Sequence, residues 1–197
     1  MVDTCGSLAA NQLLELCAYL APDNIPMRVF FGSINELPEP LRDKFADELD
    51  RLDVIAELTS NYLLNVNGND LYSMHRLVQQ VIRFEMGDNT TRLATILKNV
   101  VDTIPEEDYY TRDVFDNFAS LAEHAVVVLE FSEKFLEKAM SNFSIVEDGF
   151  CRLARGYFEF GDYAKALKYY MRGAKIAEKI YGLEDDKTAR RWRACGV

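Results

Sequence analysis

The sequence lacks the residue pairs and clusters on which most metal and nucleotide chemistry depends. It contains no Gly-Lys pair, so the phosphate-binding motif G-x-x-x-x-G-K-[ST] is absent. Its two histidines, His75 and His124, lie far apart, and none of its four cysteines forms a C-x-x-C pair. These absences argue against a structural zinc site and a self-contained nucleotide-binding domain. Because no nucleophile and base are visibly positioned either, we expect no enzymatic activity and no cofactor.

Cysteines and long apolar runs are also sparse. Cys17 and Cys151 lie within apolar helical patterns, which favours small buried side chains over a disulfide framework. No apolar run approaches the length needed to cross a bilayer. Residues 1–10 lack the basic region of a secretory signal. We therefore expect a cytoplasmic protein that does not contact a membrane.

What is present is the composition of an ordinary globular protein. The 197 residues are 49% hydrophobic and 27% charged, which is enough to build one or two small domains with a core. The formal net charge is −10. Because an acidic surface repels phosphate backbones, nucleic acid is an unlikely partner.

The pattern of residues 8–86 predicts a winged-helix-like domain. A β-hairpin is expected at 62–74, because Asn67-Gly68 readily adopts the positive φ that a tight turn requires. Three helices precede this hairpin, and helical spacing resumes directly after it. The helices are predicted over residues 8–21, 41–49, 53–62 and 74–86, with a short additional helix from Pro26 through Phe31.

Residues 88–145 predict a helical spacer, with Gly87-Asp88-Asn89 as the boundary before it. Helices are expected over 90–104 and 114–129, and Ser132 is the expected cap of another helix that reaches Met140. The predicted fold class is therefore mainly α: a winged-helix-like domain with a small β-hairpin, then a helical spacer, then α-hairpins.

The α-hairpins belong to residues 147–194. Phe150, Leu153, Ala154 and Tyr157 share one helical face, Gly161-Asp162 breaks the helix, and Tyr163, Ala166, Leu167, Tyr170 and Ala174 mark a face of the next helix. Small residues at Ala154 and Ala166 allow close approach of the two helices. This pattern resembles a tetratricopeptide repeat, and residues 185–194 look like the first helix of a further repeat.

The repeat resemblance implies an inner groove that binds proteins or peptides. Its first helix would present Asp148, Cys151, Arg155, Phe158 and Glu159 to that groove. The second helix carries a basic stripe of Lys165, Lys168, Arg172, Lys175 and Lys179, for which a solvated outer face is the favoured interpretation over a dock for an acidic peptide. Because repeats stack on one another, the resemblance also implies self-association through the repeats as a second mode of binding.

Several segments resemble NB-ARC proteins, which are nucleotide-switch signalling ATPases. They are L-L-E-L-C-A-Y-L-A-P-D-N-I-P at 13–26, L-D-V-I-A-E-L-T-S-N-Y-L-L at 52–64, Y-S-M-H-R-L-V-Q at 72–79 and L-A-E-H-A-V-V-V-L at 121–129. The resemblance implies the winged-helix part, spacer and first repeat of a signalling ATPase, starting after its nucleotide-binding core.

In that family the histidine of the hairpin-to-helix junction contacts bound ADP, and the role would fall on His75. Arg76 stands where many members have Asp. His75 and Arg76 are thus the candidate contacts to ADP or ATP, but only together with a nucleotide-binding domain that this sequence lacks. The alternative for His75 is capping or packing at the junction.

The expected function is that of a non-catalytic interaction and regulatory module. Two alternatives remain open. One is a winged-helix DNA-binding regulator, for which the 74–86 helix offers Arg76 and Arg83 beside Glu85. The other is a stand-alone tetratricopeptide adaptor.

Overall fold

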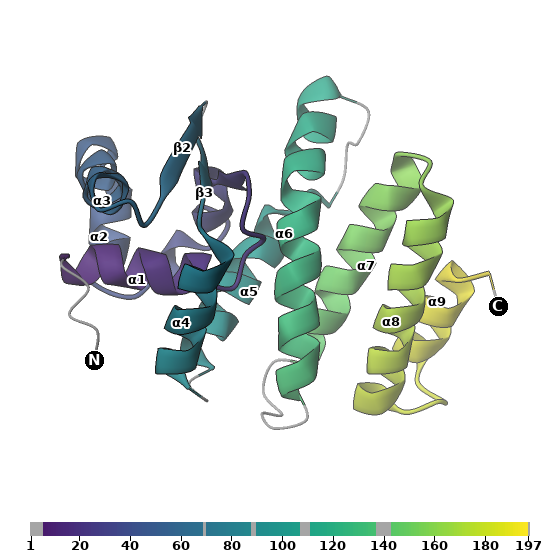
Figure 1. Cartoon of the computed structure of the whole chain (residues 1–197). Coiled ribbons are helices and arrows are strands. Elements are labelled where there is room, and N and C mark those ends of the chain that lie inside the picture. The colour runs from purple at the N-terminus through teal and green to yellow at the C-terminus, as the bar shows by residue number, and fades with distance from the viewer. Residues whose placement is uncertain (1–5, 69, 88–89, 107–110, 137–142, 197) are drawn as a thin grey trace. The chain divides into compact units, whose positions relative to one another are not determined.

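The fold is mainly α-helical with one small antiparallel sheet, as the sequence predicts (Figure 1). The computed structural model describes residues 6–68, 70–87, 90–106, 111–136 and 143–196. The chain divides into two compact units, residues 1–103 and 104–197. No helix among the described residues is long and apolar enough to cross a membrane.

Side-chain caps fix where several helices begin. The Oγ of Ser7 accepts a hydrogen bond from the Ala10 N–H, and Asp47 accepts from two backbone N–H groups of the helix that it precedes. Asp162 and Asp185 each accept a hydrogen bond from one backbone N–H at the start of a later helix. Each cap satisfies a backbone donor that has no partner within its helix, so these starts are set by local sequence.

In the part of the first unit that the structure describes, five α-helices combine with the sheet. Its core is formed by apolar side chains from α1, from η1 and from the helices that follow, including the fully buried Leu13, Phe30 and Phe45. The elements are α1 (Leu8–Cys17), η1 (Met27–Phe30), η2 (Ile34–Glu36), α2 (Leu41–Ala46), α3 (Glu48–Ser60), α4 (Arg76–Met86) and α5 (Thr91–Thr103).

The hairpin is part of a three-stranded sheet with strand order β1-β3-β2. The strands are β1 (Ile25–Pro26), β2 (Asn65–Gly68) and β3 (Leu71–Ser73), and Ile25 pairs with Tyr72. The hairpin is confirmed, but β2 extends through Gly68, whose φ of 93° fits glycine. The short helix expected from Pro26 through Phe31 is present as a 3₁₀ helix over 27–30, but its start was wrong by one residue, because Pro26 belongs to β1. Strand β1 was missed because two residues show no periodicity.

Helix α4 is attached to the end of α1 through backbone carbonyl groups. The buried side-chain amide of Gln79 donates to the carbonyl oxygens of Cys17 and Leu20, each at 3.1 Å. Arg83 donates to the carbonyl of Ala18. Carbonyls at a helix C-terminus have no partner within the helix, so these contacts satisfy them and fix α4 in place.

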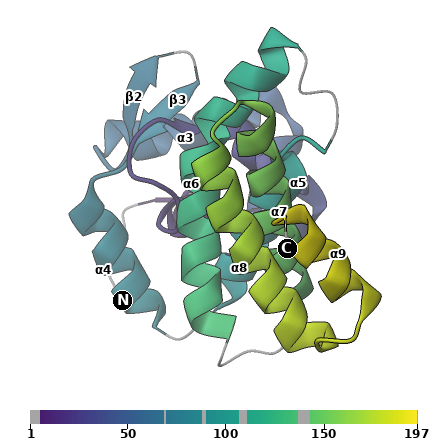
Figure 2. The same cartoon turned by 90° about the vertical axis from the view of Figure 1, so that its right-hand side faces the viewer.

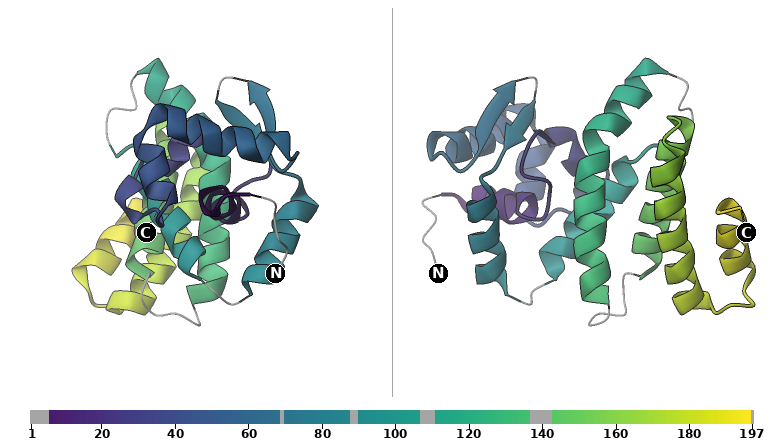
Figure 3. Two further views of the ribbon diagram at one scale, coloured as in Figure 1. Left: turned by 90° about the vertical axis from the view of Figure 1, so that its left-hand side faces the viewer. Right: turned by 45° about the vertical axis from the view of Figure 1, so that its right-hand side comes forward.

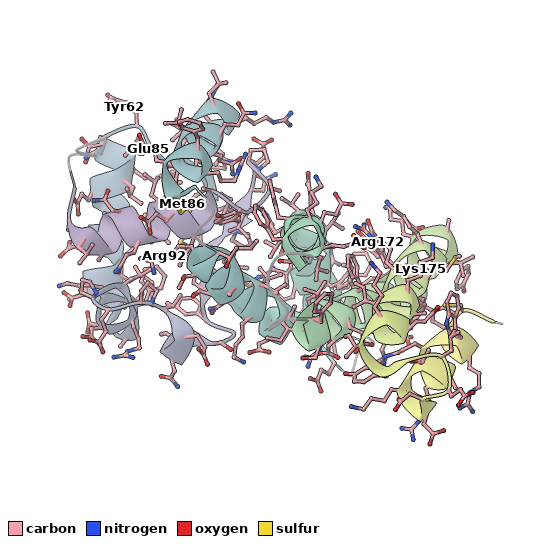
Figure 4. The ribbon with its side chains drawn as sticks, turned by 90° about the horizontal axis from the view of Figure 1, so that it is seen from below. Tyr62, Glu85, Met86, Arg92, Arg172 and Lys175 are labelled. Atoms are coloured by element: carbon pink, nitrogen blue, oxygen red, sulfur yellow. The ribbon has the colours of Figure 1, made fainter. Side chains whose placement is uncertain are left out.

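Helix α5 packs within the first unit, so the two units do not divide at the boundary expected near Gly87. Arg92 at the start of α5 forms an ion pair with Glu15 of α1 at 2.5 Å (Figure 4). Farther along, Asn99 accepts a hydrogen bond from the Ser33 N–H at 3.0 Å. The predicted spacer, 88–145, is therefore shared between the units, and residues 88–89 lie outside the described part of the chain.

The described residues of the second unit form four successive helices (Figures 2 and 3). They are α6 (Arg112–Leu136), α7 (Phe143–Glu159), α8 (Tyr163–Tyr181) and α9 (Asp186–Ala194). Ser132 does not cap a new helix, because it is buried inside α6, which runs on without a break to Leu136. The end expected at Met140 lies outside the described residues.

Small residues and aromatic rings set the packing of α7. Gly156 lies so close to the ring of Phe118 on α6 that a Cβ there would sit 2.0 Å from a ring carbon. On the other side, the ring of Tyr157 stacks on that of Tyr169 from α8 with centroids 5.6 Å apart. Tyr163 and Leu167, expected on the buried face of α8, are exposed. The buried residues of α8 are Ala166, Tyr169, Gly173, Ala174, Ile176 and Ala177.

Candidate functional site

A polar cleft of about 350 Å³ lies where α7, α8 and α9 meet. Helix α7 contributes one face to it, on which residues three, four and seven positions apart lie side by side. The cleft is lined by Pro105, Glu106, Asp148, Cys151, Arg152, Arg155, Tyr170, Arg191 and Ala194. Since all of these residues belong to the second unit, that unit forms this cleft by itself.

Arg152 is neutralised by two carboxylates at one end of the cleft. Its Nε lies 2.6 Å from Oδ2 of Asp148, one turn earlier on α7, and its terminal nitrogen lies 2.5 Å from Oε1 of Glu106. Two negative charges thus face one positive charge. This end of the cleft carries a net negative charge.

Arg191 of α9 is held by a buried carboxylate below the cleft. Its Nε lies 2.5 Å from Oε1 of Glu147, whose side chain is among the buried ones. The thiol of Cys151 also donates to that oxygen, at 3.4 Å. Burial raises the pKa of Cys151, so the thiol stays protonated at neutral pH. A protonated, buried thiol is a poor nucleophile, and Cys151 therefore contributes packing and a hydrogen bond.

Arg155 and Tyr170 provide the donors at the other end of the cleft. Arg155 is exposed and forms no ion pair with any residue that the structure describes. Burial raises the pKa of the half-buried Tyr170 hydroxyl, and the neighbouring Cys151 and Glu159 act in the same direction, while the charges of Arg155 and Arg191 act in the opposite one. The hydroxyl therefore remains a neutral donor at pH 7. This arrangement can bind an anionic group.

Three of the five residues predicted for the groove line this cleft: Asp148, Cys151 and Arg155. Phe158 does not line it; its ring packs at an angle against Tyr163 with centroids 5.3 Å apart. Glu159, the last residue of α7, is exposed and does not line it either.

Sequence reasoning missed four polar residues of the cleft. Arg152 follows Asp148 by one turn, so its spacing on α7 could have revealed it. Glu106, Tyr170 and Arg191 come from the segment before α6, from α8 and from α9, and show no such signal, because only tertiary packing brings them to α7.

His75 caps α4. Its Nδ1 accepts a hydrogen bond from the Leu77 N–H at 3.2 Å, which satisfies a free donor of the first turn. His75 and its neighbour Arg76 are both exposed. The capping interpretation of His75 is confirmed, and contact of either residue with ADP or ATP stays a prediction.

The basic stripe on α8 is partly neutralised. Arg172 pairs with Glu130 at 2.9 Å and with Glu133, both on α6, and its guanidinium lies 4.5 Å from the ring centroid of Phe150. Lys165 pairs with Asp162 at 2.9 Å. Lys175 lies one turn beyond Arg172 (Figure 4). These contacts give Arg172 a structural role, whereas Lys168 and Lys175 border a shallow apolar hollow that also includes Leu167 and Met171.

A separate apolar groove of about 250 Å³ lies on the first unit. It is bordered by the half-exposed or exposed Leu77 and Val81 of α4, with Leu14 of α1 beneath them. Phe84 on the same helix is 87% exposed. Its lining offers Glu85 as the one ionisable side chain, so this groove has no evident catalytic chemistry.

Comparison with known proteins gives one match. Residues 5–91, from before α1 to the first residue of α5, match a family described as a domain of unknown function, DUF7779. Searches of curated proteins and of solved structures found no significant match. The matched segment does not include the cleft of the second unit. Any function of that cleft has to be argued from its own geometry.

Proposed function

We propose that the chain is a non-catalytic protein-interaction and regulatory module that binds an extended peptide in the α7–α9 cleft. The observation that carries the proposal is the cleft itself: a hollow of about 350 Å³ whose donors and acceptors come from α7, α8 and α9. Clefts lined by a few convergent polar groups are the usual sites of ligand binding. In the tetratricopeptide interpretation α7 and α9 are the first helices of successive repeats and form the inner groove.

The chemistry of the cleft favours binding over catalysis. The thiol of Cys151 is buried with a raised pKa, and Arg152 and Arg191 are occupied by carboxylates. None of the described groups of His, Cys, Asp and Glu residues could hold a metal ion. We therefore propose that the protein does not hydrolyse ATP. In an intact NB-ARC-type ATPase, His75 and Arg76 would contact ADP from the winged-helix part, and the second unit would sense the partner.

DNA binding is the less favoured function. In a helix-turn-helix arrangement the recognition helix is the second of two consecutive helices, which here is α3 rather than the 74–86 helix. Helix α3 carries Glu48, Asp50, Asp53 and Glu57 against one arginine, Arg51. Four carboxylates on such a helix repel the phosphate backbone.

A cytoplasmic location also belongs to the proposal, because free buried cysteines fit a reducing compartment.

Selection from a peptide-display library on the full chain tests this proposal. Ala194 is exposed on α9 and lines the cleft, so Ala194→Trp fills the cleft without disturbing a core. Ala164 is exposed on α8 and borders the shallow hollow, which makes Ala164→Trp the matched control. We expect selected peptides to lose binding to the first variant and to keep it for the second.

The opposite pattern, or a selection that yields no peptide dependent on the cleft, would overturn the proposal. The proposal that the protein is non-catalytic is tested by an ATPase assay and by titration of the purified chain with ATP and ADP. Turnover, or tight ATP binding that is lost in His75→Ala, would contradict a non-catalytic role.

A further inference from the structure

The charges of the cleft are separated along α7. Glu106, Asp148 and Arg152 together leave one negative charge at one end, because two carboxylates face a single guanidinium. Arg191 and the buried Glu147 cancel each other. Arg155 is left as the positive charge among the lining residues at the other end, where it is exposed and forms no ion pair with a described residue; the exposed Glu159, one turn farther along α7, lies outside the lining, although its charge also acts on Tyr170. The cleft thus has an acidic end and a basic end.

The spacing of these two ends sets the length of a matching ligand. Asp148 and Arg155 lie two turns apart on α7, which corresponds to about 10 Å along the helix axis. An extended peptide advances about 3.3 Å per residue, so about three residues cover this distance. The cleft has room for more than one small ion, since its volume is about 350 Å³.

We propose that the cleft recognises a peptide that carries a carboxylate and an ammonium group three residues apart. The carboxylate binds Arg155, with the Tyr170 hydroxyl as a second donor, and the ammonium group lies between Asp148 and Glu106. This inference rests on the proposed function, since it names the class of peptide that the same cleft binds. A guanidinium is a strong partner for a carboxylate because it offers paired N–H donors in one plane.

The acidic end disfavours ligands with several negative charges. A phosphate group at Arg155 would bring about two negative charges into a cleft that already holds Asp148 and Glu106, and a nucleic acid would meet a protein with a net charge of −10. A ligand with one carboxylate and one cation matches both ends. The observed charges therefore select a peptide rather than a phosphorylated or nucleic-acid ligand.

Fluorescence anisotropy with short labelled peptides on the full chain tests the inference. The probe is an acetylated, amidated peptide with the core Lys-Ala-Ala-Glu, and the composition control is Ala-Lys-Glu-Ala, in which the charges are adjacent. A third peptide has Gln in place of Glu. A fourth ends at Lys-Ala-Ala with a free terminal carboxylate, which separates a side-chain source of the carboxylate from a terminal one. Inorganic phosphate serves as the competitor.

We expect the Lys-Ala-Ala-Glu peptide to bind at least about tenfold more tightly than the Gln and adjacent-charge peptides. Arg155→Gln removes that difference, whereas the control Lys168→Gln on the outer face of α8 keeps it. Asp148→Asn weakens the same peptide by reducing the attraction for lysine. Arg155→Glu is expected to prefer Lys-Ala-Ala-Lys, which shows charge selection even if single variants weaken packing.

Equal binding of all peptides, no binding of the first peptide up to about 1 mM, or displacement by phosphate at similar concentrations would overturn the inference. Cleft-dependent display peptides that carry no charge pair would overturn this inference alone and leave the proposed function standing. A display selection that yields no cleft-dependent peptide would remove both.

Discussion

Arg191 and Glu147 form the ion pair that fastens α9 to α7, with Nε of Arg191 2.5 Å from a carboxylate oxygen. Glu147 is only 4% exposed to solvent, whereas the side chain of Arg191 is 35% exposed. A buried carboxylate needs a partner, because desolvation without one costs several kcal/mol. The buried acid on α7 therefore determines where the short, strongly polar α9 can dock.

The first prediction concerns this pair. Arg191→Leu leaves Glu147 buried without its cation, so we expect α9 to detach and the free energy of unfolding of that helix to fall by about 2–3 kcal/mol. Hydrogen exchange of the α9 amides measures the loss. Arg190→Leu is the matched control, since Arg190 is the exposed neighbour on the same helix. Unchanged α9 protection in Arg191→Leu would show that other contacts hold the helix.

The second prediction concerns the approach of α6 and α7. Gly156→Ala places a methyl group where the ring of Phe118 now lies, with a Cβ-to-ring distance of 2.0 Å, so we expect a loss of about 2–3 kcal/mol of stability. Urea denaturation measures it. In Phe118→Leu the space opens, and the same alanine should then cost much less.

Gly173→Ala provides the comparison within the same unit. Its Cβ would lie 2.8 Å from the Cys151 Sγ, at the end of a side chain, and the alanine gains about 1 kcal/mol in helix propensity. We expect the net change to be clearly smaller than for Gly156. Equal effects at the two glycines would contradict the idea that the rigid Phe118 ring is what limits Gly156.

The sequence predicted the features that local chemistry controls. The hairpin at Asn67-Gly68 and the break at Gly161-Asp162 are present because a positive φ or a capping side chain acts within a few residues. Periodicity located the helices for the same reason. Where it failed, as at β1, the element was too short to show a period and exists because β3 lies beside it.

The candidate site, too, could be predicted only where local spacing determines it. Asp148, Cys151 and Arg155 could be predicted since they share a face of one helix, but Arg191 and Tyr170 could not. Their contribution depends on the docking of α8 and α9. Phe158 and Glu159 were placed in the groove by the repeat resemblance, but they do not line the cleft. Long-range packing, which a single sequence does not encode locally, makes up the missing part.

The third prediction separates capping from ligand binding at His75. His75→Ala removes the acceptor of the Leu77 N–H, so we expect a loss of about 1 kcal/mol in the stability of the first unit. His75→Asp should keep that stability, since aspartate also caps and favours the positive end of the helix dipole. Urea denaturation measures both variants. Arg76→Ala is the control, and a loss as large as in His75→Ala would contradict the cap.

The fourth prediction uses two buried thiols as reporters of the two units. Cys17 lies in the core of the first unit and Cys151 in that of the second. Burial raises the pKa of Cys17 to about 12, so at pH 8 only on the order of one thiol in 10,000 is ionised. Burial also raises the pKa of Cys151. Both thiols should resist alkylation in the folded protein and react once their own unit opens.

In the double variant Cys5→Ser, Cys195→Ser, only Cys17 and Cys151 remain to be alkylated. Alkylation at increasing urea concentration, read by mass spectrometry of the peptide that carries each thiol, follows the unfolding of each unit. Because each unit has a core of its own, Gly156→Ala should shift the Cys151 transition to lower urea and leave the Cys17 transition in place. The free energy of unfolding should also depend on pH, with a defined sign. Above about pH 9 the unfolded thiols lose protons that the folded ones keep, so stability should fall as pH rises toward 12. A joint shift of both thiols in Gly156→Ala would show that the units unfold as one.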